Sequence, residues 1–277
     1  SLRRRVRLGF PSPGGRRSQV CSGSIWPLQR PLLGPESWPL PLIGSRDYGN
    51  LPRLPLKDMG HEMAPFDWSG ITLTLPDETF EGSKTVSVGA RDVQLIEVGP
   101  AHTMGDAVAW VPDVEVCFAA DVLFIGGTPI AWAGPVASWR RALKSISELG
   151  AETFVPGHGP ICTQTEVDLL DDYFDWIERE GLTQLDRGVA PTDAARKLLL
   201  SDEFESLPWS AWDDPARLVV VLTVEQFRRD GGVGQLGGAG RAKAIMHMQL
   251  SKTALQRKRA ELALSLQILL GLDSTGV

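Results

Sequence analysis

Three side chains that could bind a metal ion lie in or directly after apolar, strand-like runs. His102 is in EVGPAHTMGD, Asp121 lies inside FAADVLF, and His158 is in FVPGHGP. Imidazole and carboxylate groups are common zinc ligands. Both histidines sit in turns rich in Gly and Pro after apolar runs, where a rigid sheet positions functional groups. A carboxylate inside an apolar run is costly to bury without a partner or an ion. The pattern therefore predicts a metal site.

Each of these residues also has an ordinary structural explanation. A histidine in a turn can be a capped or surface residue, and Asp121 can cap a turn or pair with an arginine. The three contexts taken together favour the metal site over three unrelated structural roles.

The elements that would position these residues are strands followed mainly by helices. Alternating or continuous apolar patterns predict strands, over 71–75, 84–88, 92–98, 107–111, 116–124 and 152–160. The last two would flank a helix over 138–149, with Ser138 as N-cap and Gly150 as its end. Further helices are predicted over 163–181, 192–200 (with Thr192 as cap) and 214–231. This order indicates an α/β layered domain.

Charge and proline content divide the chain into three regions. Residues 1–57 hold ten basic and two acidic residues and 9 of the 20 prolines, so we expect an irregular, basic, Pro/Arg-rich leader. Residues 58–231 form the expected domain, and the region 58–236 holds 12 basic and 30 acidic residues. Residues 232–277 are expected to form a Gly-rich linker and a basic helical tail over 241–270.

Composition also limits the cellular context and the partners. No apolar stretch approaches the roughly 20 residues of a membrane span, so no membrane association is expected. Three cysteines without CxxC spacing fit a reducing compartment, and we expect a cytoplasmic protein with a small-molecule substrate. The Arg-rich start has no interleaved aromatics, so nucleic acid is not the expected partner. The 241–270 helix could dock on the core, mediate self-association, or extend without a partner.

The three motifs, in this order, resemble the second, third and fourth metal motifs of the metallo-β-lactamase superfamily. The resemblance covers about residues 58–231 and includes GGTPIAWAGP. It implies an αββα sandwich with two metal ions, usually zinc, in which a metal-activated hydroxide attacks an ester, thioester, lactone or lactam bond. It further implies that His102 ligates the first ion, that Asp121 bridges both as the catalytic centre, and that His158 ligates the second.

The resemblance also implies roles for residues around these ligands. Thr103 and Asp106 would orient the ligands, Gly157 and Gly159 would let the loop wrap the ion, and Trp132 could line the substrate pocket. Family members commonly have Gly before the bridging Asp. Here it is Ala120, where we expect a methyl group to be tolerated.

One family motif has no counterpart in this sequence. HxHxDH supplies four ligands and should precede residue 58, but residues 1–60 contain no histidine. We therefore expect the N-terminal part of the fold to be incomplete or replaced, which leaves two protein ligands for each ion. Two alternatives stay open: a single zinc or iron ion held by His102, Asp121 and His158 together, or an acidic, catalytically inactive scaffold.

Overall fold

A five-stranded mixed sheet forms the centre of the protein. The computed structural model describes residues 19–20, 42–45, 76–233 and 237–269. The strand order is β4-β5-β6-β7-β8, with bounds β4 Ser83–Val88, β5 Arg91–Glu97, β6 Ala107–Val111, β7 Val116–Phe124 and β8 Thr153–His158. The α/β class and these strands agree with the sequence predictions, and the bounds differ by at most two residues.

The connections between strands follow from their turn residues. Strands β4 and β5 form an antiparallel hairpin in which Val88 pairs with Arg91, and Gly89 adopts the positive φ of 65° that the two-residue turn requires. Strands β5, β6 and β7 continue antiparallel. Strand β8 runs parallel to β7 because helix α1 (Val136–Ser147) crosses over between them.

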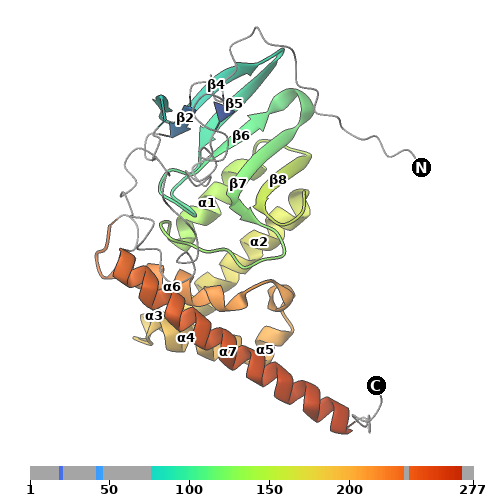
Figure 1. Ribbon diagram of the computed structural model, residues 1–277, viewed down its shortest axis with the longest axis vertical. Helices are drawn as coiled ribbons and strands as arrows, with labels where there is room; N and C mark the ends of the chain where they lie inside the picture. Colours follow the sequence, from blue (N-terminus) through green and yellow to red (C-terminus); the bar gives the residue numbers. More distant parts are fainter. Residues whose placement is uncertain (1–18, 21–41, 46–75, 234–236, 270–277) are drawn as a thin grey trace, which may run out of the picture.

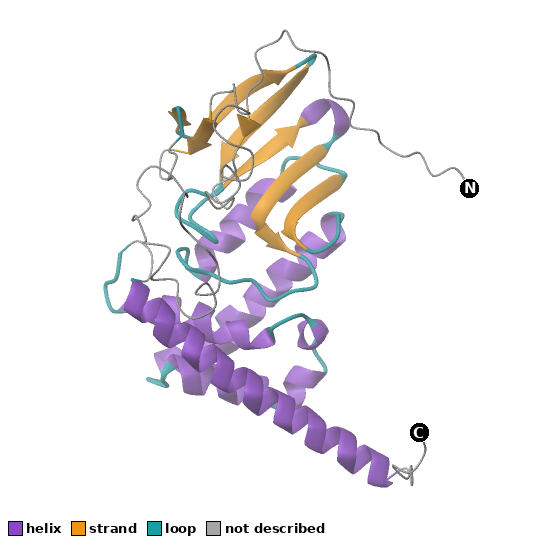
Figure 2. Ribbon diagram, viewed as in Figure 1, coloured by secondary structure: helices purple, strands orange, loops and turns teal. Residues whose placement is uncertain are grey.

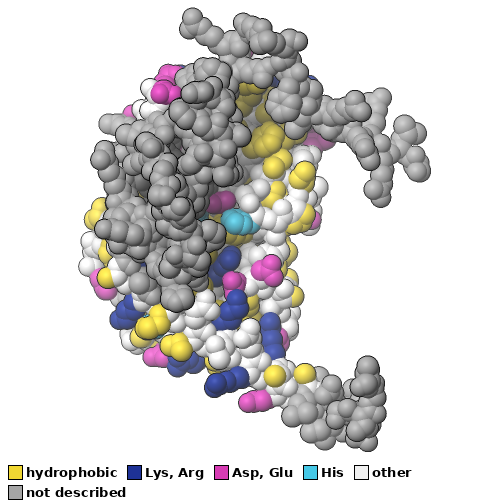
Figure 3. Space-filling model, in the orientation of Figure 1, with side chains coloured by type: hydrophobic (Ala, Val, Ile, Leu, Met, Phe, Trp, Pro, Cys, Tyr) yellow, Lys and Arg dark blue, Asp and Glu magenta, His cyan; other side chains and the backbone are white. Residues whose placement is uncertain are grey.

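The two faces of this sheet are covered differently. Helices α1 and α2 (Gln164–Trp176) lie against one face (Figure 2), where Trp139, Phe154 and Phe174 are fully buried. A smaller apolar cluster that includes Leu95 lies apart from this main core. Phe118, next to the buried Cys117 and Ala119, remains 47% exposed, and Figure 3 shows hydrophobic side chains along the strands. Strand β7 is therefore not buried on both faces, although its sequence is apolar throughout.

A second, small sheet involves the N-terminal region. Strands β1 Gln19–Val20, β2 Leu42–Ser45 and β3 Glu78–Phe80 pair in parallel in that order. Two of these strands fall within residues 1–57, which were expected to be irregular; β2 directly follows Pro41 and contains no proline itself. The strand predicted over 71–75 and the boundary at residue 57 lie outside the described residues.

Helices make up the part of the chain after β8. Their bounds are η6 Ile177–Leu182 (a π-helical turn), α3 Thr183–Asp186, α4 Pro191–Leu199, α5 Asp202–Glu205, η7 Pro208–Ala211, η8 Pro215–Arg217, α6 Leu218–Arg229 and α7 Gly238–Leu269; a 3₁₀ turn, η5 Pro112–Val114, precedes β7. Within the described parts of the chain, no helix is both long and apolar enough to cross a membrane.

Two helices begin earlier than their predicted caps. Helix α1 starts after Pro135 instead of Ser138, because the buried carboxylate of Glu225 accepts a hydrogen bond from the Val136 amide at 2.5 Å. Helix α4 starts after Ala190, with proline at its first position. Its predicted cap, Thr192, instead hydrogen-bonds His247 of α7 at 2.7 Å.

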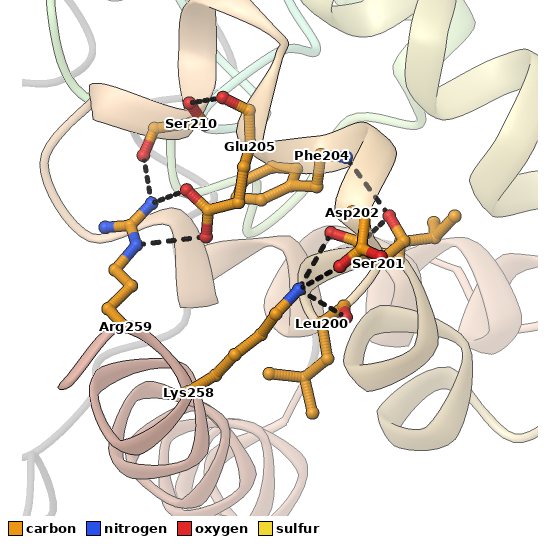
Figure 4. A network of polar contacts seen from close by, with 9 residues as sticks. Leu200, Ser201, Asp202, Phe204, Glu205, Ser210, Lys258 and Arg259 are labelled. Carbon is orange, nitrogen blue, oxygen red and sulfur yellow. Dashed lines mark hydrogen bonds and ion pairs between the residues drawn. The ribbon is translucent and has the colours of Figure 1, made fainter. Parts of the chain in front are cut away.

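The long helix α7 packs across the other C-terminal helices (Figure 1). Its buried side chains, Ala244, Met248, Ser251 and Leu255, recur at helical spacing. Lys258 donates to the carbonyls of Leu200 and Ser201, just past the end of α4, at 2.9 and 3.3 Å (Figure 4). The tail thus docks on the core, and self-association through residues 241–270 stays a prediction.

Candidate metal site

The three predicted ligands come together where β7 and β8 run side by side (Figure 1). Asp121 lies between the two histidines. Its Oδ2 is 3.6 Å from His102 Nε2, and its Oδ1 is 3.6 Å from His158 Nε2. The His102 and Asp121 side chains are only 10% and 14% exposed, whereas the His158 side chain is 58% exposed. The site is thus buried on the His102 side and open to solvent on the His158 side.

An irregularity in β7 directs the Asp121 side chain into this position. The β7–β8 register shifts on both sides of Ala120, which has a left-handed φ of 48°. Gly157 on β8 leaves the room that the carboxylate needs, since a Cβ there would lie 2.0 Å from Asp121 Oδ1. Gly157 was expected to wrap an ion; its observed role is to admit the Asp121 side chain.

The His102 ring is oriented by a backbone carbonyl. Its Nδ1 lies 2.6 Å from the carbonyl oxygen of Ile130. A carbonyl only accepts hydrogen bonds, so Nδ1 carries the proton and, in the neutral ring, Nε2 presents its lone pair toward Asp121. This is the tautomer that a metal-ligating histidine needs.

Asp106 holds the backbone of the loop that carries His102. Its Oδ2 accepts from the amides of Ala101 and Thr103 at 3.1 and 2.9 Å, and its Oδ1 accepts from the Thr103 hydroxyl at 2.6 Å. Thr103 and Asp106 were expected to orient a ligand. Their contacts hold the loop, Ile130 makes the contact to the His102 ring, and the orientation of a metal ligand stays a prediction.

His158 is placed at the end of β8 by its backbone and by an aromatic neighbour. Its carbonyl accepts from the Ile125 amide at 2.9 Å, and its ring stacks on Phe124 with centroids 4.3 Å apart and an interplanar angle of 16°. Gly159 has a φ of 95°, and a Cβ there would lie 2.1 Å from the Ile125 carbonyl oxygen. Gly159 thus allows the chain to turn tightly against β7.

Burial determines the electrostatics of the site. Desolvation lowers the pKa of His102, against the opposing effect of Asp121. Desolvation also raises the pKa of Asp121, with the two histidines opposing it. The pKa of Asp106, which is fully buried, is raised to about 6 by desolvation, while its hydrogen bonds from Thr103 lower it. A neutral His102 is the form that can bind a cation.

The donor set has the geometry of a bridge instead of a cage around one ion. Asp121 offers a different oxygen to each histidine, and no group of three or more His, Cys, Asp or Glu among the described residues is arranged to hold one ion. The two-ion and single-ion alternatives therefore both stay predictions.

Several residues that shape the site could not be identified from the sequence. Ile130 acts through its carbonyl, which has no side-chain signature, and Phe124 is one apolar residue among several in β7. The predicted pocket residue Trp132 is half-buried, and its amide donates to the His102 carbonyl at 3.3 Å. The guanidinium of Arg241 on α7 lies 5.7 Å from the Trp132 ring centroid.

Comparison with known proteins relates part of this chain to one family. The family model for the metallo-beta-lactamase superfamily matches residues 30–158, a segment that contains His102, Asp121 and His158. This match supports the assignment of the metallo-β-lactamase fold to that part of the chain. Members of this superfamily typically bind metal ions such as zinc. The match begins before residue 58, where the motifs placed the start of the resemblance.

The individual relatives and similar solved structures are distant from this chain. A hydroxyacylglutathione hydrolase from Hyphomonas neptunium is 26% identical over 148 residues, covering 50% of this chain and 54% of that protein. The chain thus spans about half the length of this curated relative. A metallo-β-lactamase family protein from Thermus thermophilus (18% identity, TM-score 0.40) covers 66% of this chain and 60% of its own. A sec-alkylsulfatase from a Pseudomonas species (13% identity, TM-score 0.45) covers 55% and 27%.

Proposed function

We propose that this chain supplies the His–Asp–His part of a two-metal hydrolase centre, with zinc as the first candidate ion and iron as the alternative. One observation carries the proposal: the two oxygens of Asp121 each face the Nε2 atom of a different histidine at 3.6 Å. The distance leaves no direct hydrogen bond between the groups. On the buried His102 side, the Nε2 lone pair and the Asp121 carboxylate are both electron-rich, and a cation between them would stabilise the pair.

The residues fit the ions in type and in orientation. Imidazole nitrogens and a carboxylate suit both zinc and iron, and the Ile130 carbonyl fixes the His102 tautomer that leaves Nε2 available. Catalytic zinc usually has three protein ligands, and these residues provide two for each ion. A bound divalent ion would lower the pKa of water and polarise a carbonyl group. His158, which is exposed, would face an incoming substrate, whereas the buried His102 would not.

The relative from Hyphomonas neptunium suggests the class of bond. That protein is named as a hydrolase of hydroxyacylglutathione, which is a thioester. We therefore place thioesters first among the ester, thioester, lactone and lactam substrates that the superfamily fold could serve. The fold itself does not decide among these substrates.

Metal content and turnover test this proposal together. The purified chain would be equilibrated with Zn²⁺ or Fe²⁺, freed of excess ion, and analysed by mass spectrometry for bound metal and by absorbance for hydrolysis of a hydroxyacylglutathione thioester. We expect bound ion in the unmodified chain and its loss in Asp121→Asn. His247→Gln is the matched control, because His247 contacts Thr192 instead of the site. Equal metal content in Asp121→Asn and the unmodified chain would refute the proposal.

A non-catalytic metal-binding scaffold is the second candidate function. It is favoured by the count of two described ligands per ion, which suits weak binding better than catalysis. The same experiment separates the two functions. Metal that depends on Asp121, without thioester hydrolysis, would support the scaffold, and metal with Asp121-dependent hydrolysis would support the enzyme.

A further inference from the structure

The loop of residues 126–135, between β7 and α1, connects the candidate site to the C-terminal helices. We propose that Arg217, Arg228 and Arg241 are positioning residues that hold this loop where it orients His102. This inference rests on the function proposed above, since the orientation of His102 matters for catalysis only if the ring binds an ion.

One side of the 126–135 loop contacts the His102 loop at three successive points. The Ile130 carbonyl lies 2.6 Å from His102 Nδ1, the Trp132 amide donates to the His102 carbonyl at 3.3 Å, and the Gly134 amide donates to the Ala101 carbonyl at 2.9 Å. A Cβ at Gly134 would lie 2.5 Å from the Pro100 carbonyl oxygen, so the two loops touch closely there. The position of the 126–135 loop therefore sets the position of the His102 ring.

Three arginines from three different elements hold this loop. Arg217 of η8 donates to the Thr128 carbonyl at 2.9 Å. Arg228 of α6 donates to the Ala133 carbonyl at 2.5 Å, and the same nitrogen lies 3.9 Å from the sulfur of Met104 on the His102 loop.

The third arginine, Arg241, belongs to the first turns of α7 and lies over the Trp132 ring at 5.7 Å. The arginine contacts thus fall at Thr128, Trp132 and Ala133, on both sides of the Ile130 carbonyl that receives His102.

These contacts matter because the loop has little regular structure of its own. Apart from an isolated bridge at Gly127, no strand or helix includes residues 125–135. Hydrogen bonds from a guanidinium to a carbonyl are stronger than those between neutral groups, and a cation over an indole ring adds a further attraction. Loss of a direct hydrogen-bond partner of a metal-binding histidine, here the Ile130 carbonyl, typically changes metal affinity by about 10–100-fold.

Helix α7 provides a matched control for general effects of helix docking. Arg259 lies on the same helix as Arg241, but it binds Glu205 and the Ser210 carbonyl, at 3.2 and 2.6 Å, instead of the 126–135 loop (Figure 4). Loss of Arg259 would weaken the docking of α7 without removing a contact to the loop. A difference between Arg241 and Arg259 variants therefore reports on the loop.

The test compares Arg228→Gln, Arg241→Gln and Arg241→Lys with Arg259→Gln in the full-length chain. The first readout needs no metal: imidazole ¹⁵N shifts of the four histidines, recorded at a pH where the rings are neutral and assigned with His102→Gln. The second readout is the Zn²⁺ dissociation constant, measured by chelator competition. Thermal melts of every variant report the change in stability.

We expect Arg228→Gln and Arg241→Gln to shift His102 away from the Nδ1-protonated tautomer and to weaken Zn²⁺ binding about tenfold. Arg241→Lys, which keeps a cation over Trp132, should restore both readouts toward those of the unmodified chain. Arg259→Gln should lower the melting temperature and leave both readouts unchanged. If Arg228→Gln fails to fold, the comparison of Arg241→Gln with Arg241→Lys decides.

The proposal is overturned if Arg228→Gln and Arg241→Gln give the same His102 imidazole ¹⁵N shifts as Arg259→Gln. This result is distinct from failure of the proposed function. If the unmodified chain binds no Zn²⁺, the metal site is wrong, and the tautomer measurement still determines whether the arginines position His102.

Discussion

Replacing Ala120 by glycine should stabilise this protein, although the substitution removes a methyl group. Ala120 has a φ of 48°, a conformation that costs an L-residue roughly 1–2 kcal/mol. Glycine adopts it freely, but it adds about 0.4–1 kcal/mol of entropy to the unfolded chain. The difference is a net gain of about 0.5–1 kcal/mol in the free energy of unfolding for Ala120→Gly. This corresponds to a rise in melting temperature of about 1–4 °C.

The neighbouring residue supplies the control for this prediction. Ala119 is fully buried and has no positive φ. Ala119→Gly therefore removes a buried methyl group and raises the entropy of the unfolded chain without relieving any backbone strain. We expect it to destabilise the protein by about 1–2 kcal/mol. Urea unfolding followed by circular dichroism would measure both variants. If Ala120→Gly destabilises the protein as Ala119→Gly does, relief of the left-handed strain at Ala120 does not outweigh the entropy that glycine adds to the unfolded chain.

Three further predictions follow from close contacts and burial. Gly157→Ala should displace Asp121, because its Cβ would lie 2.0 Å from Oδ1; we expect lost metal binding and a stability loss of about 1–3 kcal/mol, measured by metal analysis and urea unfolding. Burial raises the pKa of Glu225, so the contribution of its carboxyl group to stability is largest at low pH and is lost as pH rises through that pKa. The free energy of unfolding of the unmodified protein should therefore fall with rising pH relative to that of Glu225→Gln. A difference between the two proteins that stays constant across pH would contradict this. On α7, the Leu255 side chain is 4% exposed and the Leu262 side chain is 44% exposed. Leu255→Ala should therefore lower the free energy of unfolding by about 2–4 kcal/mol, and Leu262→Ala by less than about 0.5 kcal/mol. Equal losses of stability in thermal melts would mean that α7 is not docked as described.

The sequence predicts the strands of this fold more reliably than the starts of its helices. Strand β7 was expected over 116–124 and spans Val116–Phe124, because an uninterrupted apolar run bounded by turns is a local signal. The start of α1 depends on the Glu225 carboxylate, 89 residues away along the chain from Val136. A contact over that separation leaves no local pattern around Ser138, so the predicted cap was wrong.

In the candidate site, the side chains that carry the chemistry can be predicted from the sequence, whereas the backbone geometry that positions them cannot. His102, Asp121 and His158 can be found from the sequence because they are ionisable side chains inside or directly after apolar runs. The fold places each histidine 3.6 Å from an oxygen of Asp121. The Ile130 carbonyl cannot be found in this way, since every residue has a carbonyl and only the folded loop selects this one. The same holds for Ala120, whose methyl group was expected to be tolerated. The substitution of alanine for the family's glycine is visible in the sequence, but only the left-handed backbone gives it an energetic consequence.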